Sequence, residues 1–146
     1  MSTVDRVGEP AAGIDRGWLL RRLVDEIDGV VHAIAVSPDG LKVAFTDGLD
    51  VDRADQLSAI VSGLVSLGTG AATATELGVL QYTLLALSEG TIVVMAVADD
   101  SSLAAMTRPG CDVGAVAHHL AIMADQIGSA ISAMPRTEIA ASGVGR

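Results

Sequence analysis

Two segments of this 146-residue chain are apolar on both faces when they are drawn as extended strands. In residues 30–36 and 91–98, valine, isoleucine and alanine occupy odd and even positions alike. A strand with one face in water alternates apolar and polar residues, whereas a strand that is apolar throughout needs cover on both sides. The two segments therefore predict a sheet with helices packed on both of its faces.

Three further segments repeat their apolar residues at helical spacing, which predicts amphipathic helices. The first begins after Asp15, whose side chain can accept hydrogen bonds from the free amides of a helix start. The second begins after Asp50 and runs from about Val51 to Ala74. The third begins after Asp112 and stops at Pro135, because proline cannot continue a helix.

Short turns separate the remaining segments and define the fold class. Residues 37–40 read SPDG, a sequence that favours a type I turn between strands at 30–36 and 41–46. Further strands are expected at 78–87, 91–98 and 102–107. Connections of this length make neighbouring strands antiparallel. The predicted order is αββαβββα, a mixed α/β (α+β) fold in which a five-stranded antiparallel sheet lies between the long helix and the two terminal helices.

The apolar patterning stops near both ends of the chain. Residues 1–14 combine Gly8, Pro10 and Gly13 with small and charged residues, and 135–146 lack a periodic apolar face. We therefore expect one folded unit at 15–134, between flexible tails at 1–14 and 135–146. That length suits a single hydrophobic core.

The charge and the aromatic content exclude several classes of partner. Nine basic and eighteen acidic residues give a net charge of −9. Binding to nucleic acid depends on lysine and arginine neutralising phosphates, so this charge disfavours it. The only aromatic residues are Trp18, Phe45 and Tyr82, which also disfavours base stacking or an aromatic-lined pocket.

The sequence also predicts a compartment. No uninterrupted apolar run reaches the roughly 18 to 20 residues of a membrane span. The N-terminal residues, with Asp5 and Glu9, lack the apolar segment of a secretory signal. Cys111 is the single cysteine, so no internal disulfide can form. We expect a cytoplasmic protein that reaches a membrane only through its partners.

The candidate nucleotide and metal motifs have the wrong spacing. The glycines of residues 67–72 lie inside a helical pattern and do not follow a strand, as a dinucleotide-binding loop requires. His118 and His119 are adjacent on a helix, so their side chains point about 100° apart and do not converge on one metal ion. His32 lies on a strand, where a partly buried, hydrogen-bonded structural histidine is favoured over a catalytic base.

The acidic residues before the long helix do not form a calcium loop. Their spacing departs from the calcium-binding pattern, and the twelfth position counted from Asp47 is Ser58 instead of glutamate. A solvated, capped helix start explains them better. No serine is flanked as a nucleophile elbow, and no acid/base pair stands out. We therefore expect no catalytic residue, no cofactor and no metal site, and the chain is not predicted to be an enzyme.

The long helix has two uncharged sides. The stripe expected to face the sheet consists of Leu57, Ile60, Val61, Leu64, Gly68 and Ala71. The opposite side consists of Ala59, Ser62, Gly63, Ser66 and Gly70, where a solvated helix would carry charged residues. Two interpretations remain open. In the first, this side is covered by loops of the chain or is simply exposed to solvent. In the second, it is an interface to a second copy of the chain or to a partner protein.

Three runs of the sequence, taken in order, resemble the Roadblock/dynein light-chain family. They are WLLRRLVDEIDGVVHAIAVSPDGLKVAFTDGL at 18–49, DRADQLSAIVSGLVSLGTGAATA at 52–74 and LLALSEGTIVVMAVADDSSLAAMTRPGCDVG at 84–114. The likeness is to actinobacterial members encoded in conservon operons, beside a sensor-kinase-like protein and a Ras-like GTPase. It spans about 15–134 and implies the Roadblock, profilin-like fold.

The resemblance implies a homodimer whose long helices lie side by side and whose following strands pair across the twofold axis. It also implies that the dimer binds a small Ras-like GTPase, as the related gliding-motility regulator does, without donating an obvious catalytic residue. A sensor-kinase-like protein of the same operon is a further implied partner. Carried over to this chain, the interface consists of Ala59, Ser62, Gly63, Ser66 and Gly70 on the helix and Val79, Gln81 and Thr83 on the strand.

Two functions are therefore carried forward. The first is a non-catalytic, dimeric adaptor or regulator of a small GTPase. The alternative is a small-molecule sensor module, because similar helix/sheet/helix sandwiches bind ligands. A sensor should contain a polar-lined internal cavity, which the dense alanine, valine and leucine pattern of the strands disfavours.

Overall fold

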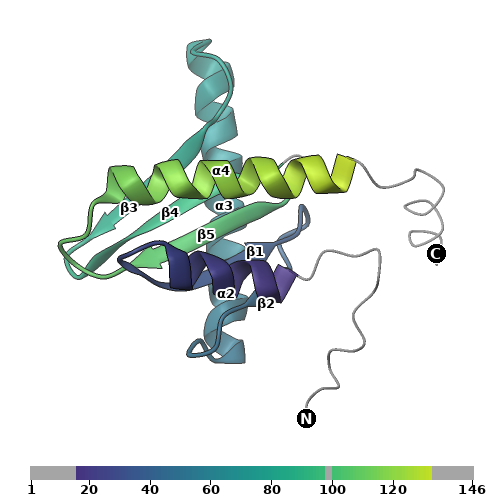
Figure 1. The fold of residues 1–146 in the computed structure, drawn as a ribbon. Helices are drawn as coiled ribbons and strands as arrows, with labels where there is room; N and C mark the ends of the chain where they lie inside the picture. Colours follow the sequence, from purple (N-terminus) through teal and green to yellow (C-terminus); the bar gives the residue numbers. More distant parts are fainter. Residues whose placement is uncertain (1–15, 98–99, 133–146) are drawn as a thin grey trace, which may run out of the picture.

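The structure, a computed structural model, describes residues 16–97 and 100–132, with side chains described from 17 to 126. The predicted tails, the proposed cap at Asp15 and the stop at Pro135 lie outside these residues. The elements are α2 (Arg16–Glu26), β1 (Val30–Val36), β2 (Lys42–Phe45), α3 (Val51–Thr75), β3 (Tyr82–Leu87), β4 (Gly90–Ala96), β5 (Ser102–Thr107) and α4 (Val113–Ser132). The predicted αββαβββα order is confirmed (Figure 1).

The five strands form one antiparallel sheet in the order β2-β1-β5-β4-β3. In this sheet order β2 and β3 are the two edge strands. β5, the last strand along the chain, lies at the centre. β1 and β5 match the predicted 30–36 and 102–107, whereas β2 and β4 are shorter than predicted. The largest difference is β3, which begins at Tyr82 and not at residue 78.

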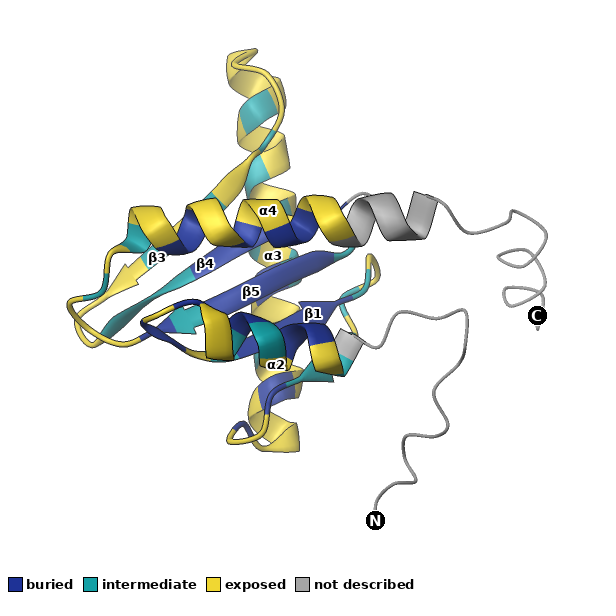
Figure 2. Cartoon of the chain, in the orientation of Figure 1, coloured by how far each residue is buried: buried dark blue, intermediate teal, exposed yellow. Residues whose placement is uncertain are grey.

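Helices cover both faces of the sheet, as the two-faced strands predict. α2 and α4 lie on one face and α3 crosses the other (Figure 1). The core beneath α2 and α4 is the larger one and includes Leu20, Leu23, Val93 and Leu120. The core beneath α3 is smaller and centres on Ile34, Val61, Val94 and Ala104. α3 has 25 residues but buries only three of them, the same number as the 11-residue α2, and most of its surface is exposed (Figure 2).

The stripe of α3 that faces the sheet differs from the prediction. Its buried residues are Ala54, Ser58 and Val61, with Leu57, Leu64 and Val65 partly buried beside them. The predicted Ile60 and Ala71 are exposed, so their assignment to the core is wrong. Small residues at 54 and 58 let the helix backbone approach the sheet, and Ser58 satisfies its hydroxyl on the Ala54 carbonyl oxygen at 2.8 Å.

By length and mean hydropathy, α3 would also qualify as a membrane span. This qualifies the expectation above, which considered only uninterrupted apolar runs. The charges of the helix are confined to its first turns, and none occurs between Asp55 and Glu76. A single such helix is weak evidence for a membrane location, and only 11% of its apolar window is buried in this fold. In this fold the helix packs on a sheet through Ala54, Ser58 and Val61.

Candidate functional site

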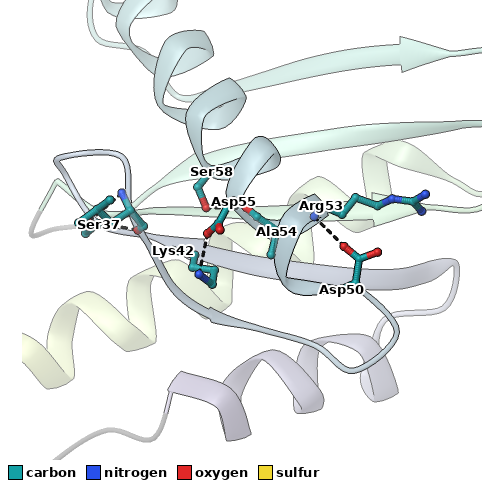
Figure 3. Close-up of polar contacts among 8 residues, drawn as sticks. Ser37, Lys42, Asp50, Arg53, Ala54, Asp55 and Ser58 are labelled. Carbon is teal, nitrogen blue, oxygen red and sulfur yellow. Dashed lines mark hydrogen bonds and ion pairs between the residues drawn. The ribbon is translucent and has the colours of Figure 1, made fainter.

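The start of α3 is fixed by polar contacts of the chain itself (Figure 3). The Asp50 carboxylate accepts a hydrogen bond from the Arg53 amide at 2.7 Å, as an N-cap residue does. Asp55 forms an ion pair with Lys42 of β2, with Nζ and Oδ1 2.6 Å apart. Asp50 thus caps the helix, and Asp55 ties its first turns to the edge strand β2.

The histidines and the cysteine are not brought together. His118 and His119 are both exposed on α4, and the Nδ1 atom of His119 lies 3.0 Å from the Ala115 carbonyl oxygen. His32 is partly buried against Gly48, as predicted, but its Nδ1 atom is buried without a hydrogen-bond partner. Within 16–97 and 100–132, no group of three His, Cys, Asp or Glu side chains could hold a metal ion.

The predicted face of α3 splits into two surfaces. Ala59, Gly63 and Gly70 are exposed on the outer side of the helix, and a Cβ atom built on either glycine would meet no atom within 4 Å. Ser62 and Ser66 instead line a groove between α3 and the sheet. The cause is the rotation of the buried stripe towards Ala54 and Ser58, which turns the serines to the flank of the helix.

The outer surface of α3 also carries large apolar side chains that the sequence interpretation missed. Ile60 is 49% exposed and Leu67 is 74% exposed. At 100° per residue, both project close to the side occupied by Gly63. We call the surface formed by Ala59, Ile60, Gly63, Leu67 and Gly70 the α3 ridge. It is uncharged and combines small residues with two apolar side chains that are half or more exposed.

The three predicted residues around β3 lie in different environments. Val79 precedes the strand, is 84% exposed and borders the groove beside α3. Gln81 also precedes it and borders a second groove, of about 480 Å³, between β3 and α4. Thr83 points towards the α3 side, because it pairs with Val94, which belongs to the core beneath α3. Its hydroxyl is buried without a partner.

The exposed side chains of β3 are those at the alternate positions. Tyr82 and Leu84 pair with Met95 and Val93, which belong to the core beneath α2 and α4. The helices on this face leave both of them half-exposed: Tyr82 is 44% exposed and Leu84 is 47% exposed. The sequence did not single them out because β3 is apolar at odd and even positions alike, so its pattern does not distinguish a covered from an uncovered side.

The two edges of the sheet differ in how they are protected. β2 has four residues, includes Lys42 and pairs with β1 through a register shift at Ala35 and Val36. Short length, lysine and irregular pairing are the features with which proteins prevent edge-to-edge association. β3 has six residues, no charge and a regular register along its whole length. Within the described part of the chain, no strand pairs with its outer edge.

A charged cluster lies on the opposite side of the molecule, on α2. Arg22 forms an ion pair with Glu26, with Nε and Oε2 2.9 Å apart, and its guanidinium carbon lies 5.1 Å from the centroid of the Trp18 ring. The hydrogen bond from Arg22 lowers the pKa of Glu26, and the same bond raises the pKa of Arg22. This charged cluster lies on α2, away from the α3 ridge and β3.

The sequence and the architecture of this chain match those of known proteins. The Roadblock/LC7 domain model matches residues 16–107. A crystal structure of a Roadblock/LC7 domain from Streptomyces avermitilis has a TM-score of 0.73 and 26% identity, over 80% of this chain and 97% of that one. A second Roadblock/LC7 domain structure from that organism has a TM-score of 0.63 and 31% identity, over 79% of this chain and 100% of that one.

A more distant structure shares the fold. MglB of Myxococcus xanthus has a TM-score of 0.73 at 12% identity, over 81% of this chain and 95% of that one. No match to a curated protein was found by sequence. The family match covers α2, the whole sheet and α3, which are the elements that form the α3 ridge and the open strand edge. The chain belongs to the Roadblock/LC7 domain family.

Proposed function

We propose that this protein is a non-catalytic homodimer that binds and regulates a small Ras-like GTPase as an adaptor. The observation that carries the proposal is the open edge of β3 beside the α3 ridge. An unprotected apolar strand edge is a template for pairing with another chain. A copy of the same chain offers the same edge and the same ridge, and a twofold axis lets both associate at once.

The dimer seat that we propose has two parts. The β3 strands pair edge to edge. The half-exposed Tyr82 and Leu84 side chains of the two copies then form one continuous surface. The α3 helices pack through Gly63 and Gly70, where the absence of side chains permits a close approach of two backbones. Ser62, Ser66, Val79, Gln81 and Thr83 flank this seat in the proposal, because their side chains point into grooves or the core.

The GTPase would bind the assembled pair. The resemblance to conservon-type Roadblock proteins supports a small GTPase as the partner and a sensor-kinase-like protein as a further one. The uncharged α3 ridge offers the GTPase shape and apolar contact in place of a catalytic side chain. Arg53 is exposed near the end of α3 that carries Asp50 and Asp52, so it lies among carboxylates and away from the ridge centre.

Three expectations from the sequence belong to the same proposal. The functional unit is the domain at 15–134, with tails at 1–14 and 135–146. The protein acts in the cytoplasm and reaches a membrane only through its partners. It needs no cofactor or metal, because its action is binding.

The test is co-purification with the small GTPase whose gene lies beside that of this chain. Separate GDP-loaded and GTP-loaded preparations should be compared, with the mass of each complex measured by light scattering. We expect two copies of this chain per complex in at least one nucleotide state. A monomeric chain would contradict the dimer, and the absence of any complex in both states would contradict the GTPase as partner.

A further inference from the structure

A groove of about 660 Å³ separates the C-terminal half of α3 from the sheet. One wall is α3, and the other is built by the β1–β2 turn and the start of β5. Apolar side chains line its depth, among them Val36, Val65 and Leu80. This volume lies within the range of roughly 300 to 1,000 Å³ that small-molecule sites occupy.

The α3 wall presents a row of hydroxyl groups. Ser62, Ser66, Thr69 and Thr73 all line the groove and follow one another at spacings of four, three and four residues, which places them on one side of the helix. Thr73 donates its hydroxyl to the Thr69 carbonyl oxygen at 3.2 Å. The other three hydroxyls have no hydrogen-bond partner within the described residues, so they are available to a ligand.

The opposite wall supplies a further hydroxyl, that of Ser102, from a residue that is otherwise covered by the chain. Ser102 begins β5, lines the groove and is only 5% exposed. Its side chain has no hydrogen-bond partner among the described residues. A ligand in the groove would therefore find a hydroxyl on the sheet side that makes no hydrogen bond within the described residues.

The charge of the groove restricts the ligand. Among the described residues that line the groove there is no lysine or arginine, and Asp100 is the only charged one of them. Phosphates and carboxylates depend on cationic or dipolar partners, so the groove does not suit nucleotides or organic acids. Hydroxyls on both walls and an apolar depth instead suit a molecule with an apolar body and amide or hydroxyl groups.

We propose that this groove binds a small, uncharged molecule that combines an apolar body with amide or hydroxyl groups. The ligand would lie between the α3 hydroxyls and Ser102. The inference does not rest on the proposed dimer or on the GTPase. It adds a ligand site next to the α3 ridge. A molecule bound there would contact both α3 and the sheet and would hold them together.

The test uses the full chain labelled with ¹⁵N and two probes that differ only in charge. N-acetyl-leucinamide is uncharged, whereas N-acetyl-leucine carries a carboxylate at neutral pH. We expect saturable amide shifts at Ser66, Thr69 and Ser102 with the uncharged probe. The carboxylate probe should bind at least about tenfold more weakly, because it would face Asp100 without a cationic partner.

Variants locate the site and separate it from the dimer. Ser102→Ala removes the hydroxyl on the sheet side of the groove and should weaken binding of the uncharged probe about fivefold or more, at unchanged mass by light scattering. Ser66→Leu should fill the groove and abolish the shifts. Thr75→Val is the matched control, because Thr75 lies on the same helix outside the groove and bonds to the Ala71 carbonyl oxygen. It should leave binding unchanged.

Four outcomes would overturn the proposal. The first is the absence of saturable shifts with the uncharged probe, and the second is equal binding of both probes. The third is binding that persists in Ser102→Ala and in Ser66→Leu while the thermal midpoints of both variants show that they are folded. Saturation by peptides of six or more residues alone would identify a peptide groove and would likewise overturn the small-molecule proposal.

Discussion

Leu80 lies so close to Gly68 that a Cβ atom built on the glycine would be 2.8 Å from the Leu80 Cδ1 atom and 2.9 Å from Cδ2. This contact holds the segment between α3 and β3 against the helix. Glycine in a helix interior costs about 1 kcal/mol relative to alanine. The contact with Leu80 explains why position 68 is glycine despite this cost. At Gly70 no atom lies within 4 Å of a built Cβ atom, so no contact within the described chain explains that glycine.

The first prediction compares alanine at these two glycines. Gly70→Ala should raise the free energy of unfolding of the single chain by up to about 1 kcal/mol, because the helix gains and no atom is displaced. Gly68→Ala should gain clearly less, since Leu80 must move. Urea unfolding in a Leu84→Lys background keeps dimer contacts out of the comparison. Equal gains at both positions would show that Leu80 does not constrain Gly68.

The second prediction concerns the two edges of the sheet. Leu84→Lys places a charge on the open β3 edge and should convert the proposed dimer to a monomer, because pairing would bury the ammonium group. Val43→Lys is the matched control on the β2 edge, where the valine is 41% exposed. Light scattering should give the dimer mass for the wild type and for Val43→Lys only. A dimer that survives in Leu84→Lys would exclude β3 from the interface.

The third prediction is a pH dependence from the Arg22–Glu26 ion pair. The hydrogen bond from Arg22 lowers the pKa of Glu26 in the folded chain, so the pair stabilises the fold at pH values above the ordinary glutamate pKa. The contribution is lost as the pH falls through the lowered pKa. Glu26→Gln should therefore lower the thermal midpoint slightly at pH 7 and leave it unchanged near pH 3.

Arg22→Gln separates the ion pair from the aromatic contact. This variant also removes the guanidinium from the Trp18 ring, which it faces at 5.1 Å. Its deficit should shrink in acid but not vanish, because the cation–π contact does not titrate. Deficits that stay constant from pH 7 to pH 3 in both variants would show that the ion pair contributes nothing to stability.

The fourth prediction compares two glycines with positive φ angles. Gly90 has φ +156°, and a Cβ atom there would lie 2.2 Å from the Thr107 carbonyl oxygen; Gly110 has φ +80° and no atom within 4 Å. Gly110→Ala should cost about 1 to 2 kcal/mol from backbone strain alone. Gly90→Ala should cost more, because β4 would have to separate from the end of β5. Denaturant unfolding measures both, and equal costs would contradict the predicted collision.

Much of the fold follows from local patterns along the chain. Strands 30–36 and 102–107 and the start of the long helix at Val51 are found where they were predicted, because apolar period, caps and turn residues are local properties. The need for helices on both faces follows from strands that are apolar on both sides. These features do not depend on which distant residue a side chain meets.

The candidate surface was predicted less well, and α3 shows why. The helix has no charge between Asp55 and Glu76, so two of its sides look equally suited to a core. Periodicity placed Ile60 in the core, whereas the structure buries Ala54 and Ser58 and leaves Ile60 exposed. The choice depends on how closely the helix backbone approaches the sheet, which is a property of the packed pair.

By itself the sequence determined the order of the elements, the layers they form and the lack of charge on α3 after Asp55. The tertiary structure decided that this surface is two surfaces, a ridge around Gly63 and a hydroxyl-lined groove that contains Ser62 and Ser66. It also decided that β3 begins at Tyr82 and leaves one edge open. The reason is physical: the period of a helix or strand arises from neighbouring residues, whereas helix rotation and strand ends are set by contacts between segments far apart in the chain.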